Sequence, residues 1–442
     1  MERALYGYLQ EWKKSSRRKP LLLQGARQVG KTWLINAFGR REYQNYIYLN
    51  FEQNPGLRSL FTGDLAPGQI IHNISLYLGQ KIEAANTLLC FDEIQALPEA
   101  ITSLKYFQEQ APQYHLVAAG SLLGVQVGKT GSFPVGKVNF MTLYSLSFSE
   151  FLDAMGEGLL LEQLRNLTAI QPLPELLHEK LLSLLKMFLY TGGMPEVVQN
   201  YLDNRDIAEV RTIQQEILEA YRRDFSKYTD ASQTQKTAEV WQSIPFQLAR
   251  ENKKFKYSDV RHKARASTFE QTIEWLKNAG LIHQAFLLRA PKLPLAGYAD
   301  FEKFKIYLHD TGLLGAMLSL SSELIIKPNQ LFAEYNGAFI ENFVATELIK
   351  EMGPDLFYWT SQGLAEVDFI LYHKNELFPV EVKSGTSRKT GSLRSYADKY
   401  HPRLLLRLSP RNLIQNKEFI NVPLYATFAL SSLMDRFSDS KR

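Results

Sequence analysis

The chain of 442 residues contains a single cysteine, Cys90, so no disulfide can form within it. No apolar run reaches the roughly eighteen residues that a membrane-spanning helix needs, and the charged N-terminal segment lacks the uninterrupted apolar core of a signal peptide. Lys and Arg exceed Asp and Glu by only five, 51 against 46, which is too little to indicate nucleic-acid binding by itself. These absences exclude a disulfide-rich secreted domain, and they predict a cytoplasmic protein that does not act at a membrane.

The composition is that of an ordinary globular protein, with 45% hydrophobic and 22% charged residues. A chain of this length is too long for one hydrophobic core, and it predicts about three domains.

A glycine-rich motif near the N-terminus is the strongest functional signal. It fits the pattern G-x-x-x-x-G-K-[ST], in which backbone N–H groups surround phosphate oxygens, the lysine reaches the terminal phosphates and the final hydroxyl holds Mg²⁺. The eight residues of this predicted ATP site are Gly25, Ala26, Arg27, Gln28, Val29, Gly30, Lys31 and Thr32.

The neighbouring residues give this motif the context that phosphate binding requires. Leu21–Leu23 predicts a short strand before the loop, and residues 32–38 predict a helix that Gly39 would end. A helix N-terminus directs its free N–H groups and its dipole at a bound anion. We therefore predict a nucleotide site rather than an ordinary glycine turn.

A second apolar run, Leu88–Phe91, ends in the carboxylate pair Asp92 and Glu93. Such a run is typical of a buried parallel strand, and ligands of open α/β sheets bind at the carboxyl ends of the strands. We predict that Asp92 holds Mg²⁺ through water and that Glu93 orients or deprotonates the attacking water.

Residues 116–120 predict a further buried strand, and Ser121 follows it. Together these elements resemble the AAA+ ATPases, and the resemblance implies that Ser121 senses the γ-phosphate. Residues 121–151 are similar to a prokaryotic branch of uncharacterised ATPases. That similarity implies a homo-oligomer in which a basic residue reaches a neighbouring subunit's nucleotide; Lys137 is the candidate and Lys129 the alternate.

A basic segment in the middle of the chain predicts a contact with DNA. Residues 249–265 contain seven Lys or Arg against two acidic residues. Helices are expected at 258–264 and from 267, where Ser267 and Glu270 form a capping box, up to Gly280. Strands are expected at 281–286 and 304–308. This order is that of a winged helix, which binds DNA in some proteins and serves as a spacer in others, and the sequence leaves both interpretations open.

A predicted β-hairpin near the C-terminus brings acidic residues together. Strands 367–373 and 376–383 around a turn at 374–375 would place Asp368 opposite Glu381, and Glu366 opposite Lys383. Directly opposed Cβ atoms lie about 5 Å apart, so two carboxylates repel there unless a cation lies between them. We predict a second Mg²⁺ or Mn²⁺ at this site, with Lys383 assisting catalysis.

The hairpin and the helix before it resemble the PD-(D/E)xK nuclease fold and the C-terminal domain usually attached to the ATPase branch. The resemblance implies Glu341 as a helical metal ligand beside Asp368 and Glu381. An inherited fold without cleavage, whose charges are satisfied by internal ion pairs, is the alternative.

The predicted class is α/β. Residues 1–155 are expected to form an AAA+ P-loop domain, 156–325 a helical lid and winged helix, and 326–442 a nuclease-like domain. We predict Mg-dependent ATP hydrolysis that serves either an action on DNA or the remodelling of a protein partner.

Overall fold

The computed structural model describes residues 1–120, 134, 136–165, 171–228, 230–250, 253–321, 336–361, 365–385, 391–416 and 419–438. The chain separates into two compact units: an N-terminal unit of residues 2–144 with 278–280, and a C-terminal unit of residue 1, 145–277 and 281–442. The segments 156–325 and 326–442 thus share the C-terminal unit, and their division into two domains stays a prediction. Within the described residues, no helix has both the length and the apolar character that crossing a membrane requires.

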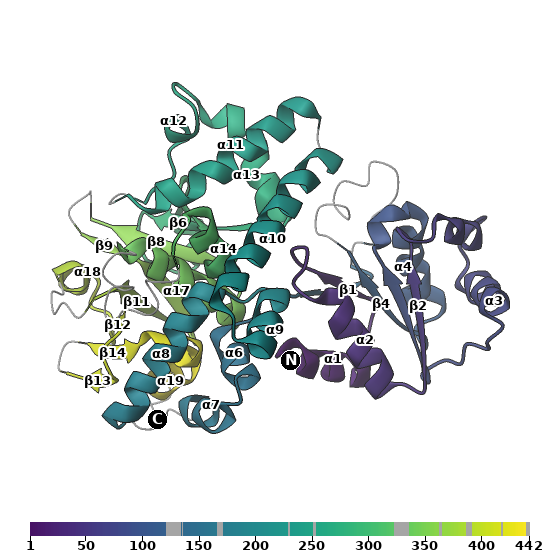
Figure 1. Ribbon diagram of the computed structural model, residues 1–442, viewed down its shortest axis with the longest axis horizontal. Coiled ribbons are helices and arrows are strands. Elements are labelled where there is room, and N and C mark those ends of the chain that lie inside the picture. Colours follow the sequence, from purple (N-terminus) through teal and green to yellow (C-terminus); the bar gives the residue numbers. More distant parts are fainter. Residues whose placement is uncertain are drawn as a thin grey trace. The chain divides into compact units, whose positions relative to one another are not determined.

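A five-stranded parallel sheet forms the centre of the N-terminal unit, in the order β2-β3-β4-β1-β5 (Figure 1). Its strands are β1 (Leu21–Gln24), β2 (Asn45–Asn50), β3 (Thr87–Asp92), β4 (His115–Ala119) and β5 (Asn139–Thr142). The helices of this unit are α1 (Leu5–Lys14), α2 (Lys31–Glu42), α3 (Pro67–Leu78) and α4 (Pro98–Gln110), with 3₁₀ turns η1 (Pro55–Phe61) and η2 (Ile94–Ala96). The strand β3 is buried at every position, as expected for a central parallel strand. The predicted α/β class is confirmed.

The helix after the glycine-rich loop is longer than predicted. We expected Gly39 to end it, but α2 continues to Glu42. A Cβ on Gly39 would lie 2.3 Å from the Tyr46 ring. The glycine therefore permits close packing between α2 and β2, and the expectation that it stops the helix was wrong.

The C-terminal unit combines helices with two mixed sheets. Its helices are α6 (Phe148–Ala154), α7 (Gly158–Arg165), α8 (Glu175–Thr191), α9 (Pro195–Asn204), α10 (Ile207–Tyr228), α11 (Ala231–Leu248), α12 (Tyr257–Val260), α13 (Ala266–Asn278), α14 (Thr311–Met317), α17 (Asn336–Met352), α18 (Gly391–Tyr400) and α19 (Leu430–Ser438). The long helix α10, drawn in teal in Figure 1, contacts α9, α11 and α14.

The first sheet of this unit has the order β7-β6-β8-β9, and the second has the order β10-β11-β12-β14-β13. The strands are β6 (Ile282–Leu288), β7 (Ala299–Leu308), β8 (Leu356–Thr360), β9 (Glu366–Val367), β10 (Phe369–His373), β11 (Glu376–Val382), β12 (Leu406–Ser409), β13 (Ile414–Gln415) and β14 (Ile420–Pro423). Because β6 pairs with both β7 and β8, the hairpin expected of a winged helix shares its sheet with strands from the C-terminal segment.

The helices before this hairpin differ in detail from the prediction. The expected helix at 258–264 is the single turn α12, and α13 begins at Ala266. Ser267 therefore lies inside α13, and the predicted capping box does not start the helix. Gly280 does end it: its φ is +72°, and the N–H of Leu281 donates to the carbonyl of Leu276 at 3.0 Å, which is the Schellman pattern.

The register predicted for the C-terminal hairpin is confirmed between residues 369–373 and 376–380. Phe369 pairs with Val380 and His373 with Glu376. The turn residues Lys374 and Asn375 both have positive φ, 44° and 66°, as a two-residue hairpin turn requires. Glu366, however, belongs to β9 and pairs with Thr360 of β8. The prediction that it faces a lysine across the hairpin was wrong, because the chain changes sheets before β10 begins.

Candidate functional site

The glycine-rich loop between β1 and α2 depends on glycine at both ends. Gly25 has a φ of +152°, and a Cβ there would lie 2.1 Å from the carbonyl oxygen of Leu143. Gly30 has a φ of +93° and is the N-cap of α2. A side chain at either position would force the backbone to move. The loop therefore holds its shape by backbone geometry and leaves the first amides of α2 without intrahelical partners.

Lys31 lies inside this loop. Its Nζ donates to the carbonyl oxygens of Gly25 at 3.0 Å and Ala26 at 2.8 Å. Burial lowers the pKa of Lys31 to about 8, and Glu93 and Asp92 oppose that shift. A phosphate oxygen is a stronger acceptor for an ammonium group than a carbonyl, so the side chain is poised to exchange these contacts for an anion.

The carboxylate of Asp92 lies beside the end of the loop. The Thr32 hydroxyl donates to its Oδ2 at 2.9 Å, and the Tyr48 hydroxyl donates to the same atom at 2.6 Å. Asp92 is buried, at the carboxyl end of β3. A hydroxyl and a carboxylate are the hard oxygen ligands that Mg²⁺ uses beside phosphates. The predicted metal residues Thr32 and Asp92 are therefore together, and their chemistry fits the ion.

Glu93 directly follows Asp92 and adopts a left-handed backbone with φ of +49°, which is uncommon for a residue other than glycine. Gln95 Nε2 donates to the Glu93 carboxylate. The turn places both carboxylates at the end of β3, and the hydrogen bond from Gln95 holds the Glu93 carboxylate in place. This arrangement matches a carboxylate that orients water.

Two residues of this site were missed by the sequence analysis, Tyr48 and Gln95. The segment NYIYLN (residues 45–50) is rich in tyrosine and isoleucine, which favour strands, and this composition could have predicted a strand there. Its pairing with β3, which aligns Tyr48 with Cys90, is not readable from the sequence.

The remaining residues predicted for ATP hydrolysis are less well defined by the structure. Ser121 and the alternate finger Lys129 lie outside the described residues. Lys137 Nζ forms an ion pair with Glu109 of the same chain at 3.0 Å. Its role in a neighbouring subunit stays a prediction.

A second cluster of charges lies in the C-terminal unit. Carboxylate oxygens of Glu341, Glu366 and Asp368 lie within 4.8 Å of one another. Lys305 Nζ lies among them, 2.9 Å from Glu341 Oε1, 2.5 Å from Glu366 Oε1 and 3.9 Å from Asp368 Oδ1. Lys253 forms an additional ion pair with Glu341. We call the three carboxylates the acidic cluster, and Lys305 and Lys253 are its two lysines.

Burial and charge act together on this cluster. Burial alone lowers the pKa of Lys305, but Glu341 and Glu366 raise it above its ordinary value. Burial raises the pKa of Asp368 to about 7, with Glu341 adding to the shift. Although burial disfavours the charged form of Glu341, Lys253 and Lys305 hold its pKa below the ordinary value. The two lysines therefore supply the positive charge that we expected from a metal ion.

The predicted ligands of that metal are only partly brought together. Glu341 and Asp368 meet, and Glu366 joins them. Glu381 is instead paired with Lys383 at 2.8 Å and with Arg407 at 3.6 Å. The roles of Glu381 and Lys383 in cleavage stay predictions. Lys305 was missed because it lies 61 positions before Glu366 in the sequence.

The basic segment predicted to contact DNA is partly neutralised by internal ion pairs. Arg250 pairs with Asp259, and Arg261 pairs with Glu239. Three other cations of this segment are exposed, namely Lys256, Lys263 and Arg265. The surface available to phosphate groups is therefore smaller than the sequence suggested.

Comparison with known proteins assigns families to three parts of the chain. Residues 17–152 match the AAA domain family. Residues 182–324 and 336–426 match two domains of unknown function, DUF8612 and DUF4143 respectively. Two uncharacterised proteins, from Mycobacterium bovis and Mycobacterium tuberculosis, are each 33% identical over 93 residues, which is 21% of this chain and 20% of each relative. The matched region thus spans about a fifth of the length of these curated relatives.

The solved structures that the comparison finds include a Walker-type ATPase of Pyrococcus abyssi, with 14% identity, a TM-score of 0.45 and coverage of 72% of this chain and 95% of that one. The Orc1 protein of Aeropyrum pernix in complex with DNA has 14% identity, a TM-score of 0.31 and coverage of 72% and 90%. The family match identifies residues 17–152 as an AAA domain, and the glycine-rich loop described above lies within it.

Proposed function

We propose that the AAA-type domain of residues 17–152 binds ATP with Mg²⁺ at the glycine-rich loop and hydrolyses it. The observation that carries this proposal is the hydrogen bond between Thr32 and Asp92 at 2.9 Å, beside a lysine held in the loop. Main-chain amides at the start of α2 and Lys31 would bind the phosphates. Thr32 and Asp92 would hold Mg²⁺, which supplies charge stabilisation at the transferred phosphoryl group.

Hydrolysis needs a group that positions the attacking water. Glu93 would orient this water or accept its proton, and Gln95 would keep the carboxylate in place. Ser121 would sense the terminal phosphate. In a homo-oligomer, Lys137 of one protomer (Lys129 as the alternate) would reach the nucleotide of the next.

The experiment is a phosphate-release assay on the purified chain with ATP and Mg²⁺. Glu93→Gln is expected to bind ATP but to hydrolyse it at least about a hundredfold more slowly, as loss of a water-positioning group does. Glu83→Gln, at an exposed position of the same unit, is the matched control and should hydrolyse ATP like the wild type. Equal rates for both variants and the wild type would remove Glu93 from the mechanism.

We propose further that the ATPase acts on DNA through the winged-helix segment of residues 257–308 and the nuclease-like segment of residues 326–442. Support comes from the exposed cations Lys256, Lys263 and Arg265 near the start of α13. ATPase stimulation by DNA that weakens steeply with salt would agree with this proposal.

Remodelling of a protein partner, with the C-terminal fold as an inactive scaffold, is the second candidate. Lys305 supports the inactive scaffold, because its ammonium already neutralises the acidic cluster. Incubation of the purified chain with DNA and Mg²⁺ or Mn²⁺, together with ATPase assays with and without DNA, decides between the nuclease and the scaffold. Cleavage that Asp368→Ala abolishes supports the nuclease, whereas intact DNA together with DNA-independent ATPase activity supports the scaffold.

A further inference from the structure

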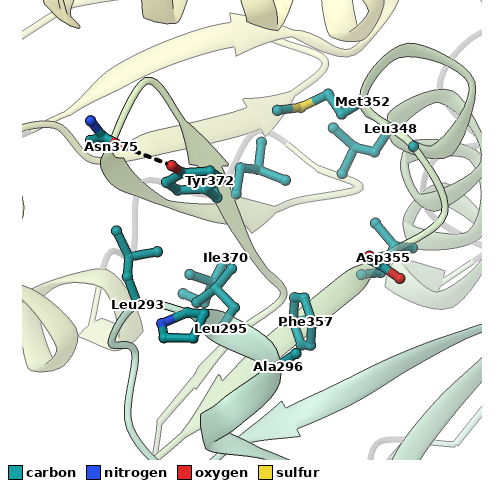
Figure 2. A pocket seen from close by; sticks show the side chains of 14 residues that line it. Leu293, Leu295, Ala296, Leu348, Met352, Asp355, Phe357, Ile370, Tyr372 and Asn375 are labelled. Atoms are coloured by element: carbon teal, nitrogen blue, oxygen red, sulfur yellow. Dashed lines mark hydrogen bonds between the residues drawn. The ribbon is translucent and has the colours of Figure 1, made fainter.

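A cavity of about 610 Å³ opens in the C-terminal unit (Figure 2). It lies between the β6–β7 connection, the end of α17, the start of β8 and the strand β10. No residue of the glycine-rich loop or of the acidic cluster lines it. Its volume falls within the roughly 300–1,000 Å³ of small-molecule sites.

The walls of the cavity are apolar. Leu295, Phe357 and Ile370 are buried and form its inner surface, while Leu293 is 42% exposed and Tyr372 is 47% exposed at the opening. Figure 2 shows these side chains arranged around one space, with Leu348 and Met352 closing it on the α17 side. An apolar molecule that enters would remove this surface from water, which is favourable in proportion to the area covered.

Polar groups lie at the edges of the cavity. At one edge the Tyr372 hydroxyl donates to Asn375 Oδ1 at 2.8 Å, and this contact fixes the exposed ring. At another edge lies Asp355, the one charged side chain among the described residues that line the cavity. Asp355 is exposed, and its side chain has no hydrogen-bond or ion-pair partner among the residues that the structure describes.

We propose that this cavity binds a small apolar molecule that carries one positively charged amino group. The apolar body would cover Leu295, Phe357 and Ile370, and the ammonium group would pair with Asp355. The charge of Asp355 selects the cation, because an anion would meet an uncompensated carboxylate and a neutral molecule would gain only the apolar contact. The inference is independent of ATP binding and of DNA cleavage.

The test uses three probes that share a naphthalene ring: 2-(1-naphthyl)ethylamine, 2-(1-naphthyl)ethanol and 1-naphthylacetate. Each is titrated into the full chain, and binding is followed by ligand-observed NMR. Fragments of this size that fit a pocket bind with a Kd of about 1 mM. The amine is expected to bind about threefold more tightly than the alcohol, as one exposed ion pair provides, and naphthylacetate is expected to bind more weakly than either.

Variants locate the binding. Asp355→Asn should make the amine and the alcohol bind equally, while Asp398→Asn, an exposed carboxylate on α18, should leave the preference unchanged. Ala296→Trp introduces bulk at an exposed lining position and should weaken all three probes at least tenfold; Leu293→Ser provides a second test if that variant does not fold. Absence of binding by the amine, a preference that survives Asp355→Asn, or binding unaffected by both lining variants would overturn the proposal.

Discussion

The Thr32 hydroxyl donates a hydrogen bond to Asp92 Oδ2 at 2.9 Å, although 60 positions separate the two residues. The parallel sheet explains this contact, because the carboxyl ends of β1 and β3 lie at the same edge. Tyr48 donates to the same oxygen. The same carboxylate oxygen thus accepts hydrogen bonds from two hydroxyl groups, of which only that of Thr32 belongs to the phosphate-binding motif.

The two hydroxyl groups have different expected roles. Thr32→Val removes an oxygen that we assign to Mg²⁺, so the gain in ATP affinity on adding Mg²⁺ should fall at least tenfold. Tyr48→Phe removes a hydroxyl that only supports Asp92, so it should keep that gain. Calorimetric titration of ATP with and without Mg²⁺ checks both. A Thr32→Val protein with the full Mg²⁺ effect would contradict the assignment.

The glycine at the start of the loop can be tested by adding one methyl group. Gly25→Ala places a Cβ against the carbonyl of Leu143, so we expect a loss of about 1–3 kcal/mol in unfolding free energy and loss of ATP binding. Gly68→Ala is the control, because its Cβ meets nothing within 4 Å, and its unfolding free energy should change by at most about 0.5 kcal/mol. Urea unfolding measures both variants. Equal stability of Gly25→Ala and wild type would show that the loop adapts.

His115 predicts how the stability of the N-terminal unit depends on pH. Burial, with smaller contributions from Arg18 and Lys13, lowers the pKa of His115 from 6.5 to about 4. Between these values the unfolded chain binds more protons than the folded chain, so this contribution to stability is lost as pH falls from 6.5 towards 4. At pH 5 the loss relative to pH 8 is about 2 kcal/mol.

The comparison with His115→Gln isolates that contribution, because other groups titrate in the same range. The glutamine side chain can still accept a hydrogen bond from Tyr43, whose hydroxyl oxygen lies 2.7 Å from His115 Nδ1. Urea unfolding at pH 5 and pH 8 should show a smaller acid loss in the variant than in the wild type. The same loss in both proteins would mean that His115 is not the titrating group.

The buried ammonium of Lys305 should be essential for stability. Lys305→Met leaves Glu341, Glu366 and Asp368 without their shared cation, which is expected to cost about 3–5 kcal/mol of unfolding free energy. Millimolar Mn²⁺ should restore part of this loss, because a divalent ion can neutralise the same oxygens. Lys303→Met removes an exposed ammonium two residues away, and it should cost less than Lys305→Met, because the buried Asp300 that it pairs with keeps Arg289 at 3.5 Å. A Lys305→Met protein as stable as Lys303→Met would contradict this account of the cluster.

The local features of this protein were largely predictable from its sequence. The glycine-rich motif, the apolar run ending in Asp92 and the alternation on either side of Lys374 each carry a periodicity or spacing that fixes one element. The hairpin register followed because a one-residue slip would have mixed apolar and acidic faces. Gly280 ended its helix for the backbone reason that was expected, whereas Gly39 served packing instead.

Most of the features that were missed depend on contacts between distant segments. Lys305 reaches Glu366 because β7 and β9 belong to one sheet, and it reaches Glu341 because α17 packs against β7. No local sequence pattern predicts either contact. Glu366 was placed wrongly for the same reason, since its strand pairs with β8 rather than continuing the hairpin. Tyr48 donates to Asp92 from a strand 44 positions earlier, whereas Gln95 was missed although it lies only two residues after Glu93. Sequence patterns describe single elements, and Lys305, Glu366 and Tyr48 act between elements.

Binding of ATP in the presence of Mg²⁺ tests the central claim most directly. Calorimetric titration of the wild type, Lys31→Ala and Lys137→Ala compares the loop lysine with a lysine that should act only on a neighbouring nucleotide. We predict that the wild type and Lys137→Ala bind ATP with similar affinity and that Lys31→Ala shows no measurable binding. ATP binding by Lys31→Ala as tight as that of the wild type would contradict the account.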